Sequence, residues 1–333
     1  MAEQSALAEH IALAVDIGGS KAEIAVIDAT GAARVPACKH PVPFSPSGAA
    51  DPAALVEILA PAVDALRATP GAVAGIGLSV CGNIAADSGE GVLVPHLHWR
   101  NVPFGRLVVE RCGLPIFPAT DVRQATLAEA LWGAAQGARF FAWCTIGTGY
   151  GGYFLLDGRL YHGVHGFAGP FGHSTVDEVN GYPCGCGRRG CVETYVAGPA
   201  IARAGQQLAD SGDSPALRAL AADGPVTTAH VFAAAAQGDP ASQAVLDGVI
   251  RRVAISLASL VNTLDLELIV VGGSVAHAAP DFVPRIGARM LDFFMSEEAK
   301  RDFRLVRESL PNSALYGAAA DAFVRSGVLA LPD

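Results

Sequence analysis

Charged residues are scarce in this sequence, which narrows what the protein can bind. Only 17% of the 333 residues are charged, the formal net charge is -9, and lysine occurs only as Lys21, Lys39 and Lys300. A protein that binds a nucleic-acid backbone needs clustered basic side chains to neutralise phosphates, and neither end of this chain carries such a run. We therefore expect no nucleic-acid partner.

Long uninterrupted apolar segments are also missing. The stretch Ile250–Leu260 contains Arg251 and Arg252 and is shorter than the roughly 20 residues that span a bilayer. The first ten residues include Glu3 and Gln4 in place of the basic segment and apolar run of a secretory signal. These absences predict a cytoplasmic protein without a membrane partner.

Cysteine is sparse outside one short stretch. Four of the seven cysteines are scattered, and small buried hydrophobic side chains are the simplest interpretation for these: Cys38, Cys81, Cys112 and Cys144. The other three lie together between residues 184 and 191. This clustered, odd-numbered set favours a metal site in a reducing compartment over a disulfide framework.

Apolar residues make up 51% of the chain, which suits a folded α/β protein long enough for two domains. Two apolar runs between Ile11 and Asp28 flank a glycine-bearing turn and predict a β-hairpin. Alternating helix and strand patterns follow over residues 52–67, 74–79, 104–112 and 114–117. A second strand, glycine turn and strand, at 140–146, 147–149 and 151–156, repeats the hairpin. The repeat indicates a duplicated architecture, and the rest is expected to be largely helical around a strand at 268–271.

Glycine turns follow three of the apolar strands. Their residues are Asp16, Gly18, Gly19, Ser20 and Lys21 in the first, Gly147, Thr148 and Gly149 in the second, and Gly272 and Gly273 in the third. Glycines let backbone N–H groups approach phosphate oxygens, and an Asp carboxylate can hold Mg²⁺ through water. An ordinary hairpin turn explains any one motif equally well, but three turns at strand ends favour a nucleotide site.

The stretch from His173 to Cys191 supplies one imidazole and the three clustered thiols, Cys184, Cys186 and Cys191. This composition is typical of a closed tetrahedral zinc site, which leaves no position open for a reacting water. The alternative is that His173 is a core or substrate histidine and that the thiols are free. We expect a structural zinc ion held by these four residues.

Asp121 lies between the apolar strand at 114–117 and a helix expected at 124–135. A carboxylate at this position can be a general base or the N-cap of the helix. From the local residues alone, the cap is the simpler interpretation.

The order of these motifs resembles the ROK family, the group of repressors, open reading frames and kinases that includes bacterial sugar kinases. The resemblance runs from Ala14 to about Ala320 and is most specific in the run Cys-x-Cys-Gly-x-x-Gly-Cys-x-Glu that ends at Glu193. Its other elements are Asp16 to Lys21, Gly75-Ile76-Gly77, Cys81-Gly82, Pro95-His96-Leu97, Trp99, Asp121, Gly147-Thr148-Gly149, Gly172-His173, Gly272-Gly273 and Tyr316-Gly317-Ala318-Ala319.

The resemblance implies a two-lobed actin-like ATPase fold, of the duplicated ribonuclease H-like type, with ATP and Mg²⁺ in a cleft between the lobes. It also implies that Asp121 deprotonates the attacking substrate hydroxyl, which replaces the cap interpretation. By the same analogy the protein is a homodimer. We expect an N-terminal lobe at 1–121 and a C-terminal lobe at 122–333, with a zinc-binding insertion near 173–191 and a last helix able to return to the N-terminal lobe.

The positions at which this chain departs from the family pattern are ones that contact the substrate in glucose kinases of the family. Glucose kinases of this family usually have Asn before the base, Asn shortly after it and Glu before the zinc His, where this chain has Thr120, Arg123 and Pro170. His96 likewise replaces an Asn. Losing a carboxylate that accepts hydrogen bonds from sugar hydroxyls weakens binding of the original substrate.

We therefore expect phosphorylation of a primary, 6-OH-type hydroxyl on a modified hexose or a carbocyclic analogue (a cyclitol). The expected substrate contacts are Thr120, Asp121, His173, Glu193, Arg123 and His96. An ordinary glucokinase, compensated by Arg123 and His96, is the alternative.

A sugar sensor or transcriptional regulator is a competing function of another class. Regulators that resemble this family carry a winged helix-turn-helix before the first phosphate loop, and only fifteen residues precede Asp16. The retained Asp16 and Asp121 and the acidic balance also favour a kinase.

Overall fold

The computed structural model describes residues 2–222 and 224–331, and the chain forms two compact units. The first unit is built from the chain up to residue 137, residues 158–160 and the chain from residue 309 on, and the second from residues 138–157 and 161–308. The first stretch of the first unit ends at residue 137, whereas the sequence analysis predicts a boundary after residue 121. The unit extends further because α4 (Asp121–Leu131) packs against the last helix, α12 (Ser313–Arg325). The last helix belongs to the N-terminal unit.

The main sheet of the first unit has the strand order β3-β2-β1-β4-β8. These strands are β1 (His10–Ile17), β2 (Lys21–Asp28), β3 (Ala33–Pro41), β4 (Ala72–Val80) and β8 (Ile116–Thr120). β1 and β2 form the antiparallel hairpin that the apolar runs predict, and β4 and β8 continue the sheet in parallel with β1. A smaller sheet contains β5 (Asn83–Ile84), β6 (Gly91–Val94) and β7 (Trp99–Val102), and β11 (Arg159–Leu160) is a further short strand.

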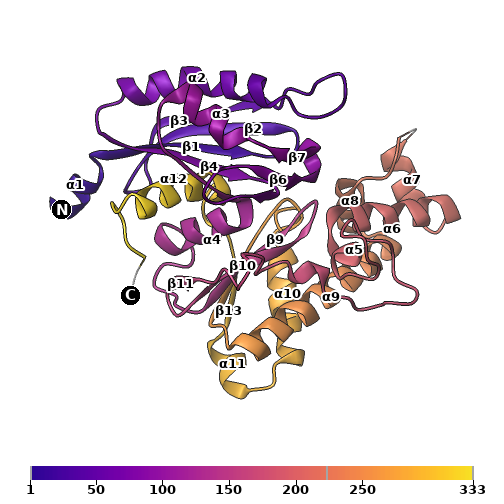
Figure 1. Cartoon of the computed structure of the whole chain (residues 1–333). Helices are drawn as coiled ribbons and strands as arrows, with labels where there is room; N and C mark the ends of the chain where they lie inside the picture. Colours follow the sequence, from indigo (N-terminus) through magenta and orange to yellow (C-terminus); the bar gives the residue numbers. More distant parts are fainter. Residues whose placement is uncertain (1, 223, 332–333) are drawn as a thin grey trace. The chain divides into compact units, whose positions relative to one another are not determined.

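The helices of this unit cover the two faces of its main sheet (Figure 1). One face carries α2 (Pro52–Ala68) and α3 (Phe104–Cys112), and the other carries α4 and α12. The remaining helical segments are α1 (Ala2–Leu7) and the 3₁₀ turn η1 (Pro95–Leu97). The period of two along a strand separates the faces, because Leu13 and Val15 pack in the α2 cluster while Ala12 and Ala14 pack in the α12 cluster.

Small residues let α12 lie unusually close to the sheet and to α4. A Cβ added at Gly77 of β4 would fall 1.7 Å from the backbone oxygen of Ala318, and one at Gly317 would fall 1.8 Å from that of Gln124. Any larger side chain at either position would force the helix away. This close packing fixes α4, which carries Asp121, against the sheet.

The sheet of the second unit repeats the plan of the first. Its strands β10 (Tyr150–Leu156), β9 (Phe141–Ile146), β12 (Leu268–Gly272) and β13 (Arg304–Arg307) lie side by side in that order. β9 and β10 form an antiparallel hairpin, and β12 and β13 run parallel to β9. This duplication matches the prediction from the repeated strand, turn and strand pattern.

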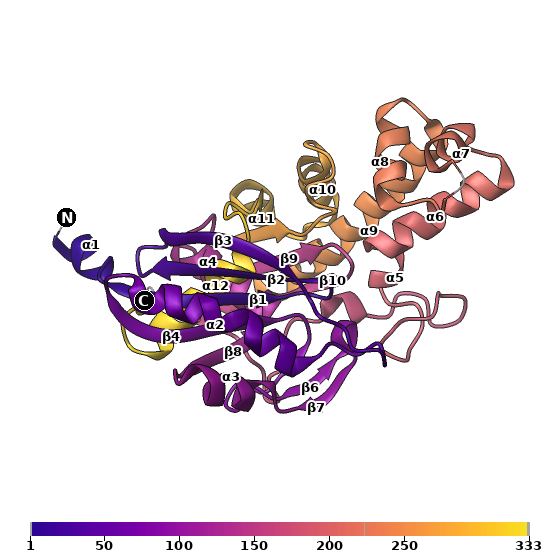
Figure 2. The same cartoon turned by 90° about the horizontal axis from the view of Figure 1, so that it is seen from above.

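Several helices accompany this sheet in the second unit. They are α5 (Glu193–Val196), α6 (Gly198–Ser211), α7 (Pro215–Ala221), α8 (Thr228–Ala236), α9 (Pro240–Leu264), α10 (Phe282–Met290) and α11 (Glu297–Asp302), with 3₁₀ turns η2 (Phe171–His173) and η3 (Leu291–Phe293). Figure 2 shows α6, α7 and α8 grouped near the start of α9. Buried Val249, Val253 and Leu257 give α9 a helical-period stripe that faces the core. Within the described ranges, no helix is long and apolar enough to cross a membrane.

Candidate active site and metal centre

Asp16 lies next to the end of β1, where its carboxylate is held by two donors. One oxygen accepts a hydrogen bond from the Ser79 hydroxyl at 2.7 Å, and the other accepts from the Asn312 amide nitrogen at 3.2 Å. Burial raises the pKa of Asp16, and the charge of Glu23 adds to the shift. The carboxylate is thus oriented by neighbours from β4 and from the residue preceding α12.

The first glycine turn joins β1 to β2 and lies beside His96. The backbone N–H of Gly18 donates to the oxygen of Lys21 at 2.9 Å, which closes the turn. A Cβ at Gly19 would approach the Cβ of His96 to 2.9 Å, so only glycine lets η1 pack here. Ser20, Lys21 and His96 are exposed, and their polar groups are accessible to a ligand.

Asp121 is the first residue of α4 and is partly exposed. Burial raises the pKa of Asp121 to about 6, and the negative charge of Asp16 contributes to this shift. One carboxylate oxygen accepts from the backbone N–H of Val122 at 2.9 Å. The N-cap of α4 is Thr120, whose hydroxyl oxygen accepts from the N–H of Arg123 at 3.4 Å. The cap and the candidate base are therefore neighbouring residues with separate tasks.

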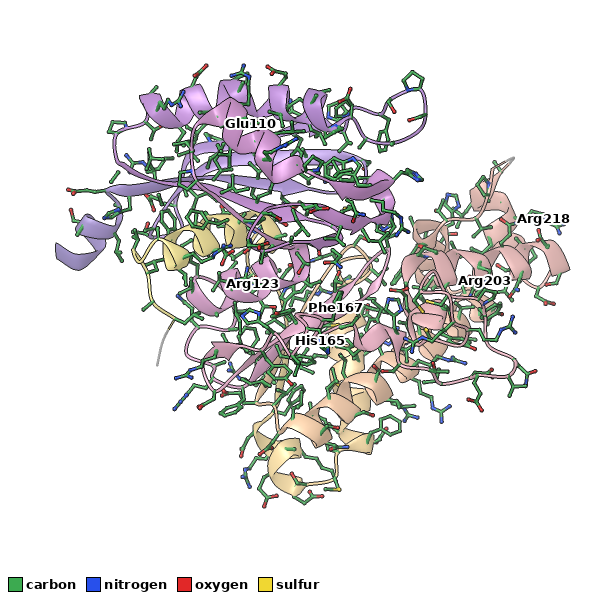
Figure 3. The ribbon with its side chains drawn as sticks, in the orientation of Figure 1. Glu110, Arg123, His165, Phe167, Arg203 and Arg218 are labelled. Atoms are coloured by element: carbon green, nitrogen blue, oxygen red, sulfur yellow. The ribbon has the colours of Figure 1, made fainter. Side chains whose placement is uncertain are left out.

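The guanidinium of Arg123 forms an ion pair with Asp321. Its two terminal nitrogens donate to the two oxygens of Asp321 at 2.8 and 2.9 Å, and Asp321 is 1% exposed. Figure 3 shows Arg123 on α4. A bidentate pair of this kind fixes both side chains. This pair holds α4 to α12 and uses two of the five N–H donors of Arg123, whose contact with substrate stays a prediction.

The second and third glycine turns meet in the second unit. The N–H of Gly147 donates to the oxygen of Gly149 at 3.0 Å, and the N–H of Gly198 donates to the oxygen of Gly147 at 2.7 Å. Gly273 has φ +93°, and a Cβ there would lie 2.7 Å from the oxygen of Ile146. The parallel pairing of β9 with β12 brings these two turns to the same end of the sheet. Thr148 is exposed at this end.

A pocket of about 870 Å³ opens beside these turns and lies entirely within the second unit. Its lining residues are uncharged. The polar ones are Thr148, Thr227, Thr228 and Ser274 with Gly147, and the apolar ones include Val226, Phe232, Ala236, Val275, Ala279 and Pro280. Its size and largely apolar walls suit a flat heterocycle, and its glycine end suits a phosphate chain.

Glu193 connects the glycine turn of this unit to the cysteine-rich loop. One of its oxygens accepts from the backbone N–H of Tyr150 at 3.0 Å. Its other oxygen lies 3.9 Å from Nδ1 of His173 and 3.8 Å from Sγ of Cys184. His173 and Glu193, both expected to contact substrate, are thus brought together.

His173, Cys184, Cys186 and Cys191 place one ligand atom each within 4.8 Å of one another. The Sγ atoms of Cys186 and Cys191 are 3.6 Å apart, and Sγ of Cys184 lies 3.5 Å from Nδ1 of His173. A tetrahedron with arms of about 2.3 Å has edges of about 3.8 Å, so these separations fit a closed zinc centre. The four thiol and imidazole ligands predicted from the sequence are assembled without a disulfide between them.

Several polar neighbours of the site are not predicted by any local sequence motif. Ser79 and Asn312 orient Asp16 from positions far along the chain. Thr227 and Asn312 carry a local signal, because each precedes a helix as an N-cap residue. That signal identifies the start of a helix but says nothing of the ligand or carboxylate nearby.

The duplicated sheet and the glycine turns at its strand ends define a protein with the two-lobed actin-like ATPase fold. A family model described as the ROK family matches residues 12–323, and the chain belongs to this family.

Three relatives differ in their roles. An N-acetylmannosamine kinase from Citrobacter koseri is 34% identical over 80% of this chain and 84% of its own. A ROK family glucokinase from Streptomyces griseus, solved with glucose and AMPPNP, has a TM-score of 0.75 and 29% identity, and the match covers 93% of this chain and 98% of that one. A ROK family transcriptional regulator homologous to the E. coli MLC protein has a TM-score of 0.81 and 25% identity over 97% of this chain and 81% of its own.

Proposed function

We propose that the protein is an ATP-dependent kinase that phosphorylates a primary hydroxyl of a hexose-like substrate. The proposal depends on the exposure and the pKa of Asp121. A partly exposed carboxylate with a pKa of about 6 is charged near neutral pH yet basic enough to take a proton from an attacking hydroxyl. The kinases among the family relatives support this reaction class.

The donor site is assigned to the pocket beside the second and third glycine turns. The apolar walls around Phe232 accept an adenine ring, and the turn at Thr148 faces the phosphates. The hydroxyl oxygen of Thr227 caps α8 but can still donate its proton to the ribose. The AMPPNP bound to the S. griseus glucokinase supports an adenine nucleotide as the donor. The glycine turn at Gly18 and Gly19, with Ser20 and Lys21, is the proposed phosphate contact of the first unit.

Asp16 is the proposed holder of magnesium, and its oriented carboxylate fits the preference of this ion for hard oxygen ligands. Magnesium neutralises charge on the phosphates when it is bound. Asp121, Thr120 and His96 are the proposed acceptor contacts of the first unit. His173 and Glu193 are those of the second unit. Thr120 uses its oxygen as a cap and can still donate its hydroxyl proton.

We assign a structural zinc ion to the cysteine cluster. His173 directs Nδ1 toward the thiols, which leaves Nε2 for the acceptor. Such an ion anchors the loop between residues 173 and 191 and supports both His173 and Glu193.

The acceptor is proposed to be a modified hexose or a cyclitol. The absence of a carboxylate at Pro170 and the side chains of Thr120 and His96 support this class. The likeness to an N-acetylmannosamine kinase supports a modified sugar, whereas the likeness to a glucokinase supports plain glucose as the alternative.

A panel of acceptors tests this assignment. With saturating ATP and Mg²⁺, ADP release should be fastest with an amino sugar, a deoxy sugar or a cyclitol, and glucose should have a kcat/KM lower by at least about tenfold. Glucose as the best acceptor would replace this proposal with a glucokinase. Absence of phosphoryl transfer to every polyol would favour a sensor like the related regulator.

The pH dependence of the reaction should report Asp121. Because burial and the charge of Asp16 raise its pKa to about 6, the base becomes protonated and inactive as the pH falls through that value. We expect log kcat/KM to fall with unit slope below about pH 6 and to level above it. Circular dichroism at each pH should show that the protein stays folded. A fall in kcat/KM that is centred near pH 4, as for an ordinary carboxyl group, would show that Asp121 is not the group that titrates.

A further inference from the structure

Glu129 is a buried carboxylate in the last turn of α4 that the proposed reaction does not use. Its side chain is 0% exposed. Its oxygens accept hydrogen bonds from the backbone N–H groups of Ala134 at 2.6 Å, Ser309 at 3.2 Å and Leu310 at 3.3 Å, and from the Ser313 hydroxyl at 2.7 Å. A buried carboxylate is stable only when such donors stay in place, because each lost donor leaves the buried charge less well compensated.

Most of these donors belong to one segment, residues 309–313, which leads into α12. Glu129 binds this segment at Ser309 and Leu310 before the helix and at Ser313 in its first turn. Asn312 lies between them, so the segment on either side of it is fixed from α4. Glu129 thus holds the segment that carries Asn312.

The hydrogen bonds around Asn312 define which way its amide points. Its oxygen caps α12 by accepting from the N–H of Leu315 at 3.1 Å. Its nitrogen consequently faces two carboxylates, Asp16 at 3.2 Å and Glu23 at 3.2 Å. These two acids are paired across the β1–β2 hairpin, so the NH₂ group donates to both and reduces their mutual repulsion.

We propose that Asn312 and Glu129 are positioning residues that set the geometry of Asp16 for magnesium. The proposal rests on the proposed function, in which Asp16 holds the ion. Asn312 donates the hydrogen bond that orients the carboxylate of Asp16. Glu129 acts indirectly, because it fixes the segment that carries Asn312. Neither residue contacts the reacting atoms.

Asn312→Ser separates this role from helix capping, because Ser caps a helix about as well as Asn but cannot supply the NH₂ group. We expect the Mg²⁺ concentration for half-maximal rate to rise about tenfold or more, with a much smaller change in kcat at saturating Mg²⁺. Asn312→Asp also keeps the cap and adds a third carboxylate, so its effect should be larger. Glu129→Gln should change the Mg²⁺ requirement in the same direction.

Calorimetric titration with ADP gives a readout that does not depend on turnover. In the wild-type protein Mg²⁺ should strengthen ADP binding, and in Asn312→Ser this enhancement should fall about tenfold. The matched control is Ser296→Ala, which removes the cap of α11 in the second unit and should leave the Mg²⁺ dependence unchanged.

The outcomes separate the two proposals. A wild-type protein that neither binds ADP nor transfers phosphate would overturn the proposed function. A wild-type protein with Mg²⁺-dependent ADP binding, together with folded Asn312→Ser and Asn312→Asp variants that keep the wild-type dependence, would overturn the positioning role alone. Thermal melting monitors folding, and Asn312→Asp decides the question if the Ser variant is unstable.

Discussion

Replacing Asp121 by Asn is expected to lower kcat by at least about 100-fold while the protein remains folded. The amide has nearly the shape of the carboxylate and can still accept the hydrogen bond from the backbone N–H of Val122. Thr120, not Asp121, supplies the side-chain cap of α4, so the helix keeps its N-terminal hydrogen bond. The variant loses only a group that can accept a proton near neutral pH. Steady-state kinetics with the best acceptor measures the loss.

Asp64→Asn provides the matched control for the Asp121 experiment. Asp64 lies on α2 with its side chain 81% exposed, and it forms a long 4.0 Å ion pair with Arg67. This variant makes the same chemical change away from the site and should keep wild-type kcat and stability. Full activity in Asp121→Asn, with the fold verified by its melting curve, would remove Asp121 as the base and with it the main support for kinase chemistry.

Local sequence patterns were sufficient for much of the fold. The hairpin of β1 and β2 follows from two apolar runs around a glycine turn, and α3 begins and ends at the residues that the pattern predicts. The cysteine cluster was also predictable, because three thiols and an imidazole at short spacing have few alternative uses. In both cases the interacting residues are close in sequence, so their types and spacing carry the information.

The ion pair of Arg123 is an interaction that local sequence patterns do not predict. The resemblance makes Arg123 an expected substrate contact, but no local pattern shows that a carboxylate 198 positions away, Asp321, binds both terminal nitrogens of its guanidinium. Asn312 is a similar case, since it reaches Asp16 across 296 positions. Such partners depend on how α12 packs against α4 and the sheet, which a single sequence does not encode as a local motif. The same reason hides the walls of the pocket beside Thr148, which come from several helices.

Loss of the proposed zinc ion should have the second large effect. Cys191→Ser is expected to reduce bound zinc from about one per chain to nearly none and to lower Tm by about 10 °C or more. Cys191 is 0% exposed, and its backbone pairs with Thr175 across the loop. The loop between η2 and α5 has little regular secondary structure of its own, so a metal ion would replace the hydrogen-bond ladder that it lacks. Elemental analysis and thermal melting measure the two effects.

The effect of zinc loss on activity follows from Glu193, two residues after Cys191. Its carboxylate holds the N–H of Tyr150 at the start of β10, so disorder in the cysteine loop would release the turn at Gly149 as well. We expect Cys191→Ser to lose most of its kcat/KM, whereas Cys38→Ser, which changes an exposed cysteine outside the cluster, should retain zinc, Tm and activity. Wild-type protein that is purified under reducing conditions without zinc, and whose Tm and kinetics are unaffected by adding zinc or a chelator, would contradict a structural zinc ion. The thiols would then be free, and Glu193 would hold the turn without support from a metal.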